Sequence, residues 1–252
     1  MAKPNDKIAI FDSGLGGLSV LREMIRILPQ EQFLYFGDSA NAPYGTRPTE
    51  QVRQLTLAAA EQLLSRDVKA LVIACNTATS AAISQIRQAH PDSIIVGIEP
   101  ALKPAAETFP SGHIGIIATP VTLREERFSH QLERFPGIRT TLFPAPGLVE
   151  LIETGQLDTP AVYALLQELL GAYSGQLDAL VLGCTHYPFV KKAIQDILPG
   201  TLLLDGSGGT ARETKRRLAQ AGLLSAGPGG VTLENSLSSP EIFALSNKLL
   251  NL

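Results

Sequence analysis

The sequence of 252 residues is poor in cysteine, in long apolar runs and in blocks of like charge. Two cysteines alone do not make a zinc site, and in a reducing compartment they stay thiols. No stretch approaches the ~20 apolar residues of a membrane span. The apolar run at 8–11, which follows a polar start, is far too short for the core of a signal peptide. We therefore expect a cytoplasmic protein with no metal site and no contact with a membrane.

Positive and negative charges are also close to balanced, with a formal net charge of −3. The densest basic run, Lys215-Arg216-Arg217, falls in a helical pattern and is interpreted as a solvated helix face. This distribution does not indicate a nucleic-acid groove or a membrane surface. The 44% of apolar residues is typical of a globular protein, and the length allows one large domain or two smaller ones.

Short runs of Ile, Val and Leu alternate along the chain with amphipathic helical segments. In the first half there are four such pairs, each an apolar run followed by an expected helix: the run 8–11 and the helix 17–28, the run 33–36 and the helix 49–64, the run 70–74 and the helix 78–88, and the run 94–98 and the helix 100–108. In the second half the order is 114–118 and 121–135, 140–143 and 159–172, 179–183 and 188–198, 202–204 and 209–221. Residues 229–236 and the segment after Pro240 add a strand and a helix. Buried runs alternating with helices predict an α/β fold whose parallel sheets are covered on both faces.

The two halves of the chain resemble each other in sequence. IAIFDS at 8–13 matches IGIIAT at 114–119, and ALVIACNT at 70–77 matches ALVLGCTH at 179–186. In the second pair, five of eight positions are identical or nearly so, and the only two cysteines of the chain coincide. We therefore expect two pseudo-symmetric α/β domains that arose as copies of one unit.

We expect the first domain to cover residues 1–98 and the second 99–210, with part of the segment from about 210 to 252 packing on the first.

The candidate site follows from this arrangement. Ligands of open parallel sheets bind at the carboxyl ends of the strands, so the active site is expected in the cleft between the domains. The residues that follow the strands are mostly small and polar, with thiols and carboxylates among them. They are Asp12, Ser13, Asp38, Ser39, Tyr44, Gly45, Cys75, Asn76, Thr77, Thr119, Cys184, Thr185 and His186.

The cysteines are the most informative of these residues. Cys75 and Cys184 each end a buried strand and begin a turn into a helix, where the helix N-terminus favours the thiolate. A lone cysteine there is more often part of the core, and a disulfide is disfavoured in a reducing compartment. Two thiols at equivalent positions of a duplicated unit instead approach one cleft from opposite sides. Such a pair suits the inversion of a stereocentre, because one thiolate removes a proton while the opposite thiol delivers one.

Neighbouring side chains can assist the thiols. Asp12 can orient one thiol or pair with a substrate ammonium group, and His186 can assist the other. Asp38 and Glu153 are further acid–base or orienting candidates. The loops are poor in Arg and Lys, and the nearest is Arg47. An anionic substrate would then be held by backbone N–H groups and neutral side chains, namely Ser13, Asn76, Thr77, Thr119 and Thr185.

No cofactor is indicated by the motifs. The segment DSGLGG at 12–17 lacks the glycine spacing of a dinucleotide fingerprint, and it has no Lys-Ser or Lys-Thr of a phosphate-binding loop. Nothing suggests a pyridoxal phosphate lysine, a flavin loop or a metal cluster. We therefore expect a reaction that the side chains perform alone.

Four motifs resemble those of the glutamate racemases, within the wider aspartate/glutamate racemase superfamily. They are IAIFDSGLGGLSVL at 8–21, FGDSANAPYGTR at 36–47, ACNTATSAA at 74–82 and LGCTHYPFV at 182–190. The resemblance implies two α/β domains with the site between them, no cofactor, and glutamate as substrate. It also implies that D-glutamate is supplied for peptidoglycan synthesis, and it allows a homodimer that the sequence itself does not indicate.

The resemblance also assigns roles to residues. It implies that Cys75 abstracts the proton from D-glutamate and Cys184 from L-glutamate. It implies substrate contacts from Asp12, Ser13, Tyr44, Gly45, Asn76, Thr77, Thr185 and His186. One departure is Ala145, which stands where many relatives carry a cysteine, so that position has no catalytic thiol here.

Three alternatives remain open. A racemase of aspartate or another amino acid is the nearest, but such relatives tend to carry an acidic residue at the position of His186. A non-catalytic amino-acid-binding module would have no need of paired thiols. A thiol redox protein would place its cysteines close together in sequence.

Overall fold

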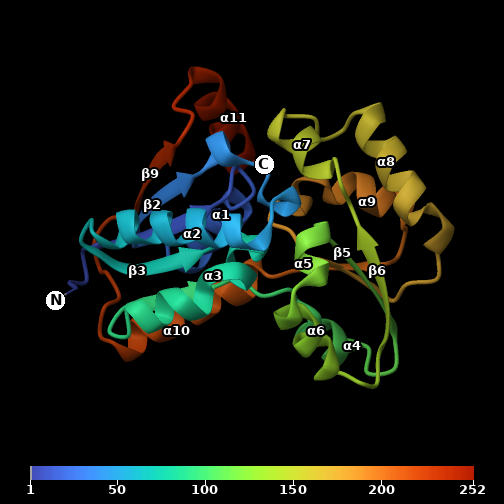
Figure 1. The fold of residues 1–252 in the computed structure, drawn as a ribbon, viewed down its shortest axis with the longest axis horizontal. Coiled ribbons are helices and arrows are strands. Elements are labelled where there is room, and N and C mark those ends of the chain that lie inside the picture. Colours follow the sequence, from blue (N-terminus) through green and yellow to red (C-terminus); the bar gives the residue numbers. More distant parts are fainter. Residues whose placement is uncertain (1) are drawn as a thin grey trace.

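The computed structural model describes residues 2–252, which form two lobes that each contain a parallel β-sheet (Figure 1). The first lobe is built on a five-stranded sheet in the order β4-β3-β1-β2-β9, and the second on a four-stranded sheet in the order β6-β5-β7-β8. The strands of the first lobe are β1 (Lys7–Asp12), β2 (Gln32–Gly37), β3 (Val68–Ile73), β4 (Ile94–Gly97) and β9 (Gly230–Asn235). Those of the second are β5 (His113–Ala118), β6 (Arg139–Pro144), β7 (Ala179–Leu182) and β8 (Leu202–Asp205).

Helices cover both faces of each sheet. The first lobe carries α1 (Leu18–Ile27), α2 (Thr49–Leu64), α3 (Asn76–Ala89), α10 (Ser207–Gln220) and α11 (Pro240–Leu250). The second carries α4 (Leu102–Thr108), α5 (Pro120–Arg124), α6 (Glu126–Glu133), α7 (Leu148–Glu153), α8 (Pro160–Leu170) and α9 (Lys191–Ile197). Short 3-10 turns occupy Ser39–Asn41, Tyr44–Thr46, Gly171–Tyr173 and Tyr187–Val190. Within residues 2–252, no helix is both long and apolar enough to cross a membrane.

The alternation of side chains along β1 explains how its sheet is covered. Ile8 and Ile10 pack into the same apolar cluster as α1 and α10, whereas Ala9 and Phe11 pack with α2 and α3. All four side chains are fully buried. A parallel strand that is buried on both faces reads as a continuous apolar run, which is why the strand is recognisable in the sequence.

The predicted pseudo-symmetry is confirmed. The order β4-β3-β1-β2 in the first lobe equals the order β8-β7-β5-β6 in the second, so each of these eight strands has a counterpart at the matching place and, among the strands of the described residues, only β9 has none. The registers agree as well: Ile8 lies opposite Ala70 in the first sheet, and Ile114 lies opposite Ala179 in the second. The matching sequences at 70–77 and 179–186 therefore occupy matching strand ends.

The C-terminal segment returns to the first lobe. α10 packs against α1, and β9 pairs in parallel with β2 and so forms the edge of the first sheet. Domain boundaries at residues 98 and 210 remain a prediction about where the two units divide.

A buried ion pair ties this returning segment to the first sheet. The side chains of Lys69 and Glu31 contact each other and are 0% and 2% exposed. Lys69 Nζ also donates to the carbonyl of Leu223 at 2.9 Å, and Glu31 Oε1 accepts from the backbone N–H of Ser225 at 3.0 Å. Because each partner also makes a hydrogen bond to the returning segment, part of the desolvation cost of the two charges is offset. The pair lies at the opposite ends of the strands from the pocket described below and explains why the chain after α10 folds back.

Three expectations about helices were wrong in detail. The helix expected near 121–135 is two helices, because Glu125 between them has an extended backbone with φ −70° and ψ 133°. The helix expected near 188–198 begins as the 3-10 turn Tyr187–Val190 and becomes α-helical only at Lys191. Helix α7 was not expected at all. It has six residues and begins after Gly147, whose φ of 85° sets the direction of the chain.

Candidate active site

The strand ends of both sheets meet around one small pocket. Its lining is Ser13, Pro43, Tyr44, Gly45, Cys75, Asn76, Thr77, Thr119, Val149, Cys184, Thr185 and His186. Ten of these residues were singled out in the sequence, and Pro43 and Val149 were not. The cavity left between them has a volume of about 10 Å³, which is about the room that one water molecule needs. Any larger ligand therefore requires the surrounding loops or the lobes to move apart.

Cys75 lies at the end of β3, on the side of the pocket that the first lobe forms. It is the N-cap of α3, and its Sγ accepts the backbone N–H of Ala78 at 3.4 Å. Burial raises the pKa of the thiol to about 12, the negative charge of Asp12 adds to this, and hydrogen bonds from Ser13 and Ala78 oppose it. The helix N-terminus thus favours the thiolate, as expected, but burial outweighs it. Burial therefore favours the protonated form of Cys75 at neutral pH.

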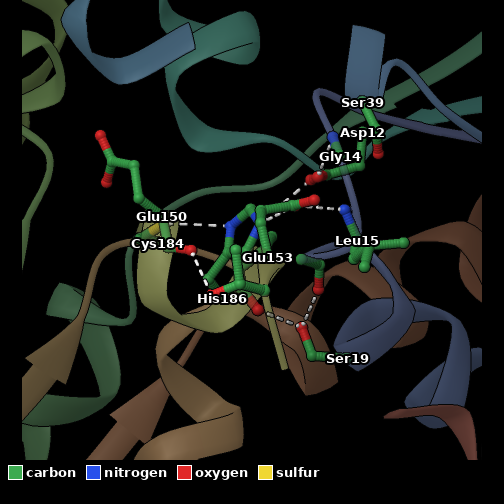
Figure 2. Close-up of polar contacts among 12 residues, drawn as sticks. Asp12, Gly14, Leu15, Ser19, Ser39, Glu150, Glu153, Cys184 and His186 are labelled. Atoms are coloured by element: carbon green, nitrogen blue, oxygen red, sulfur yellow. Dashed lines mark hydrogen bonds and ion pairs between the residues drawn. The ribbon is translucent and has the colours of Figure 1, made fainter. Parts of the chain in front are cut away.

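Cys184 lies at the end of β7, on the side that the second lobe forms, and has a different environment. Its Sγ is 3.6 Å from Nδ1 of His186, and Nε2 of the same ring is 2.5 Å from Oε1 of Glu153 (Figure 2). Burial alone would lower the pKa of His186, but the hydrogen bonds with Cys184 and Glu153 outweigh it and raise this pKa well above its ordinary value. The protonated form of the ring is therefore favoured, and this ring lies between the Cys184 sulfur and the Glu153 carboxylate. We call Cys184, His186 and Glu153 the relay.

The relay is held in place by the first lobe. Oε1 of Glu153 accepts the backbone N–H of Leu15 at 2.6 Å (Figure 2). A Cβ added at Gly14 would lie 2.1 Å from the Glu153 carboxylate, and one at Gly16 would lie 2.4 Å from Nδ1 of His186. The glycines of this loop are therefore required because the backbone approaches the relay too closely for a side chain.

Asp12 lies behind the pocket and joins the lobes. Its carboxylate is fully buried, accepts the backbone N–H of Gly14 at 3.0 Å, and accepts the hydroxyl of Thr185 at 3.0 Å. Burial raises the pKa of Asp12, and the nearby His186 opposes this. Ser19 adds a second link between the lobes, because its hydroxyl donates to the carbonyl of Thr185 at 2.8 Å. Asp12 thus holds Thr185 in position and does not itself line the closed pocket.

Asp38 and Ser39 also lie outside the pocket lining. Asp38 accepts the hydroxyl of Tyr44 at 2.7 Å and the amide of Asn41. Ser39 accepts a hydrogen bond from the amide of Asn235 at 2.8 Å. In this structure the two residues support the loop that carries Tyr44.

The lining offers little fixed positive charge to a ligand. It contains neither Lys nor Arg, and Arg47 is turned to the carbonyl of Asn41, to which its Nε donates at 2.7 Å. Oδ1 of Asn76 is buried without a hydrogen-bond partner, so this side chain has unused capacity within the pocket. In the described part of the chain, no cluster of three or more His, Cys, Asp or Glu side chains is arranged to hold a metal ion.

Val149 and the placement of Glu153 were the parts of the site that the sequence did not reveal. Both lie on α7, a helix too short to show a clear period. Ala145 is buried and its carbonyl accepts the hydroxyl of Tyr187 at 3.4 Å.

Comparison with known proteins agrees with the motifs. Residues 8–214 match the model of the family described as Asp/Glu/Hydantoin racemase. A glutamate racemase of Clostridium kluyveri is 49% identical over 248 residues, which cover 96% of each chain. A crystal structure of glutamate racemase from Thermus thermophilus, in complex with β-chloro-D-alanine, superposes with a TM-score of 0.83 at 38% identity, over 98% of this chain and 94% of that one. A structure of glutamate racemase from Francisella tularensis with D-glutamate gives a TM-score of 0.87 at 28% identity, over 99% and 95%. The chain belongs to the Asp/Glu/hydantoin racemase family.

Proposed function

We propose that this protein interconverts L-glutamate and D-glutamate by proton transfer at the α-carbon between Cys75 and Cys184, without a cofactor. As a member of a racemase family it is an isomerase. The observation that carries the proposal is the position of the two thiols, which line one pocket from equivalent strand ends of two related sheets. The choice of glutamate is supported by the 49% identity to the racemase of Clostridium kluyveri.

The reaction needs one base and one acid on opposite faces of the α-carbon. A thiolate removes the α-proton and becomes a thiol, and the electron pair of the broken C–H bond spreads into the α-carboxylate. The opposite thiol then delivers its proton to the other face and becomes a thiolate. The reverse reaction uses the same groups in exchanged roles, so one site serves both enantiomers.

The two environments suit different starting roles. Burial favours the thiol form of Cys75, which can act as the acid, while Cys184, which we assign as the base, lies beside the protonated ring of His186. The closed protein is thus prepared for abstraction by Cys184, the thiol that the family resemblance assigns to L-glutamate. When Cys75 is the base, the substrate ammonium group entering the pocket supplies the positive charge that a buried thiolate needs. The product D-glutamate would supply peptidoglycan synthesis.

The first test is racemisation by the purified protein alone. L-Glutamate incubated with the protein should lose its optical rotation, and the rate should survive exhaustive dialysis, a chelator and carbonyl reagents. The physical reason is that both proton transfers are assigned to side chains of the chain itself. L-Aspartate in parallel tests the nearest alternative. Activity that is lost on dialysis and restored by pyridoxal phosphate or a metal ion would refute the cofactor-independent mechanism.

A second prediction concerns the substrate carboxylates, which we propose are held by neutral groups because the lining contains no Lys or Arg. Ser13→Ala, Asn76→Ala and Thr185→Ala should each raise KM or lower kcat/KM, at a cost of roughly 1–3 kcal/mol for the hydrogen bonds lost. Initial rates over a range of glutamate concentrations measure this. The picture is wrong if these variants behave as wild type while Arg47→Ala alone abolishes binding.

A further inference from the structure

Three threonine hydroxyl groups from the two lobes meet at the wall of the pocket. Oγ1 of Thr77 lies 3.2 Å from Oγ1 of Thr119 and 3.2 Å from Oγ1 of Thr122, and the last two are 2.9 Å apart. Thr77 comes from α3 of the first lobe, whereas Thr119 and Thr122 come from the start of α5 in the second. Thr77 and Thr119 line the pocket, but Thr122 does not. We call these three hydroxyl groups the threonine ring.

The closed ring has no proton to offer to a ligand. Each hydroxyl has one proton and two lone pairs, so three mutual contacts use all three protons. A carboxylate has only acceptor oxygens. A carboxylate that binds to Thr77 or Thr119 must therefore accept a hydrogen bond from a hydroxyl that now donates within the ring. One hydrogen bond of the ring is then exchanged for a hydrogen bond to the ligand.

Thr122 can donate two hydrogen bonds to Thr119, one from its backbone N–H and one from its hydroxyl. Oγ1 of Thr119 already accepts the backbone N–H of Thr122 at 3.3 Å, as the N-cap of α5. The Thr122 hydroxyl is buried, with 1% of the residue exposed, and its side-chain partners among the described residues are Thr119 and Thr77. When it donates to Thr119, both lone pairs of that oxygen are filled. The Thr119 hydroxyl can then act toward the pocket only as a hydrogen-bond donor.

We infer that Thr122 is a positioning residue that makes Thr119 a hydrogen-bond donor toward a substrate carboxylate. The chain from the Thr122 hydroxyl through Thr119 to the carboxylate is polarised in one direction, which strengthens each bond in it. Gly45 supports the same geometry, because its backbone packs so tightly on Thr119 that an added Cβ would lie 2.7 Å from Thr119 Cβ. The inference rests on the proposed function, since it takes glutamate as the ligand.

The test compares Thr122→Val, which keeps the shape and removes the hydroxyl, with Thr122→Ser, which keeps the hydroxyl. Thr122→Val should raise the KM for both enantiomers of glutamate about 2- to 10-fold, the equivalent of one neutral hydrogen bond, and leave kcat nearly unchanged. Thr122→Ser should keep the wild-type KM. Thr56→Val is the matched control, because the Thr56 hydroxyl is also buried but donates to the carbonyl of Val52 at 2.7 Å on α2, away from the pocket. Its KM should stay at the wild-type value.

Titration calorimetry with D-glutamate in a Cys75→Ser background, in which racemisation is slow, measures the same contact with little turnover, and thermal unfolding verifies that each variant is folded. An unchanged KM and Kd in Thr122→Val overturns the inference. A KM that rises as much in Thr122→Ser as in Thr122→Val also overturns it, because it would mean that packing of the methyl group matters instead. If Thr122→Val does not fold, Thr122→Ala takes its place with the same expectations. A wild-type protein that neither binds nor racemises glutamate overturns the proposed function, and this inference with it. An active wild type with an unaffected Thr122→Val overturns the inference alone.

Discussion

Cys75→Ser and Cys184→Ser should each slow glutamate racemisation by roughly 10²–10⁴-fold, the contribution typical of one general acid–base group, and each should remain folded. Serine has almost the shape of cysteine, so the buried strand ends should pack as before. Its hydroxyl group is a far weaker acid, however, and hardly ionises near neutral pH. Because every turnover needs a base and an acid, loss of either thiol slows the whole reaction. Optical rotation measures the rate, and circular dichroism on heating measures the fold.

Within each variant, the loss of racemisation should be the same from L-glutamate as from D-glutamate. L- and D-glutamate have equal free energies, so kcat/KM must be the same from either enantiomer in any variant. The roles of the thiols therefore have to be separated by another reaction. In a glutamate analogue with chlorine on the β-carbon, removal of the α-proton leads to loss of chloride and formation of a C=C bond. That elimination needs the abstracting thiolate but no proton delivery to the α-carbon.

Each cysteine variant should then keep elimination from one enantiomer only. Following the family assignment, Cys184→Ser should still act on the D analogue, and Cys75→Ser should still act on the L analogue. Chloride release measured for both enantiomers gives the result. Equal loss from both enantiomers in both variants, or near-normal racemisation by either one, would show that the thiols do not divide the reaction between them.

The pairing of the thiols was predictable because it depends on strand ends. Cys75 and Cys184 each directly follow a continuous apolar run, and the carboxyl ends of parallel strands share one edge of a sheet. The match between residues 70–77 and 179–186 placed the two cysteines at equivalent ends, and the strand orders agree with it. Sequence periodicity is sufficient for this step because no side-chain packing has to be known.

Other parts of the site depend on packing and could not be predicted. Glu153 reaches His186 only because α7, a six-residue helix, packs beside the start of the first lobe. The protonated state of Cys75 follows from burial, a tertiary property that overrides the favourable helix N-terminus. The contact between Thr122 and Thr77 joins two lobes, and the helical pattern that contains Thr122 does not reveal which neighbour its hydroxyl meets.

The relay beside Cys184 leads to the second large expected effect. His186→Asn should slow elimination from the L analogue by about 10²-fold, at the lower end of the contribution of a positioned acid–base group, and leave elimination from the D analogue largely unchanged. Asparagine removes the protonated ring that lies beside the Cys184 sulfur, which we propose assists this thiol. Cys75 has its own partners, Ser13 and Ala78, which this substitution does not touch. Racemisation should fall equally in both directions, because it needs both thiols.

Glu153→Gln separates the charge of the relay from its shape. The Gln oxygen can still accept the backbone N–H of Leu15, as Glu153 does at 2.6 Å, so α7 should stay in place. The rate from the L analogue should fall roughly 10-fold or more, since a hydrogen bond to a charged group contributes about 1.5–3 kcal/mol. The carboxylate stabilises the charged imidazolium and so raises the pKa of His186. A neutral amide removes that stabilisation, and the pH at which His186 deprotonates should move to a lower value in the pH profile of the L reaction.

The chain offers a matched control for this prediction in a second Glu–His pair. Glu61 Oε1 lies 2.7 Å from Nε2 of His90 on the surface of the first lobe. His90 follows the last turn of α3, at the opposite end of that helix from Cys75. Glu61→Gln and His90→Asn make the same chemical changes without touching the relay, so both reactions should proceed at wild-type rates. A relay that acts on Cys184 predicts an effect confined to one enantiomer and a shifted pH profile. If His186→Asn and Glu153→Gln instead slowed both enantiomers alike at every pH, the pair would merely hold the lobes together, and Cys184 would have to work without help from the charge of the His186 ring.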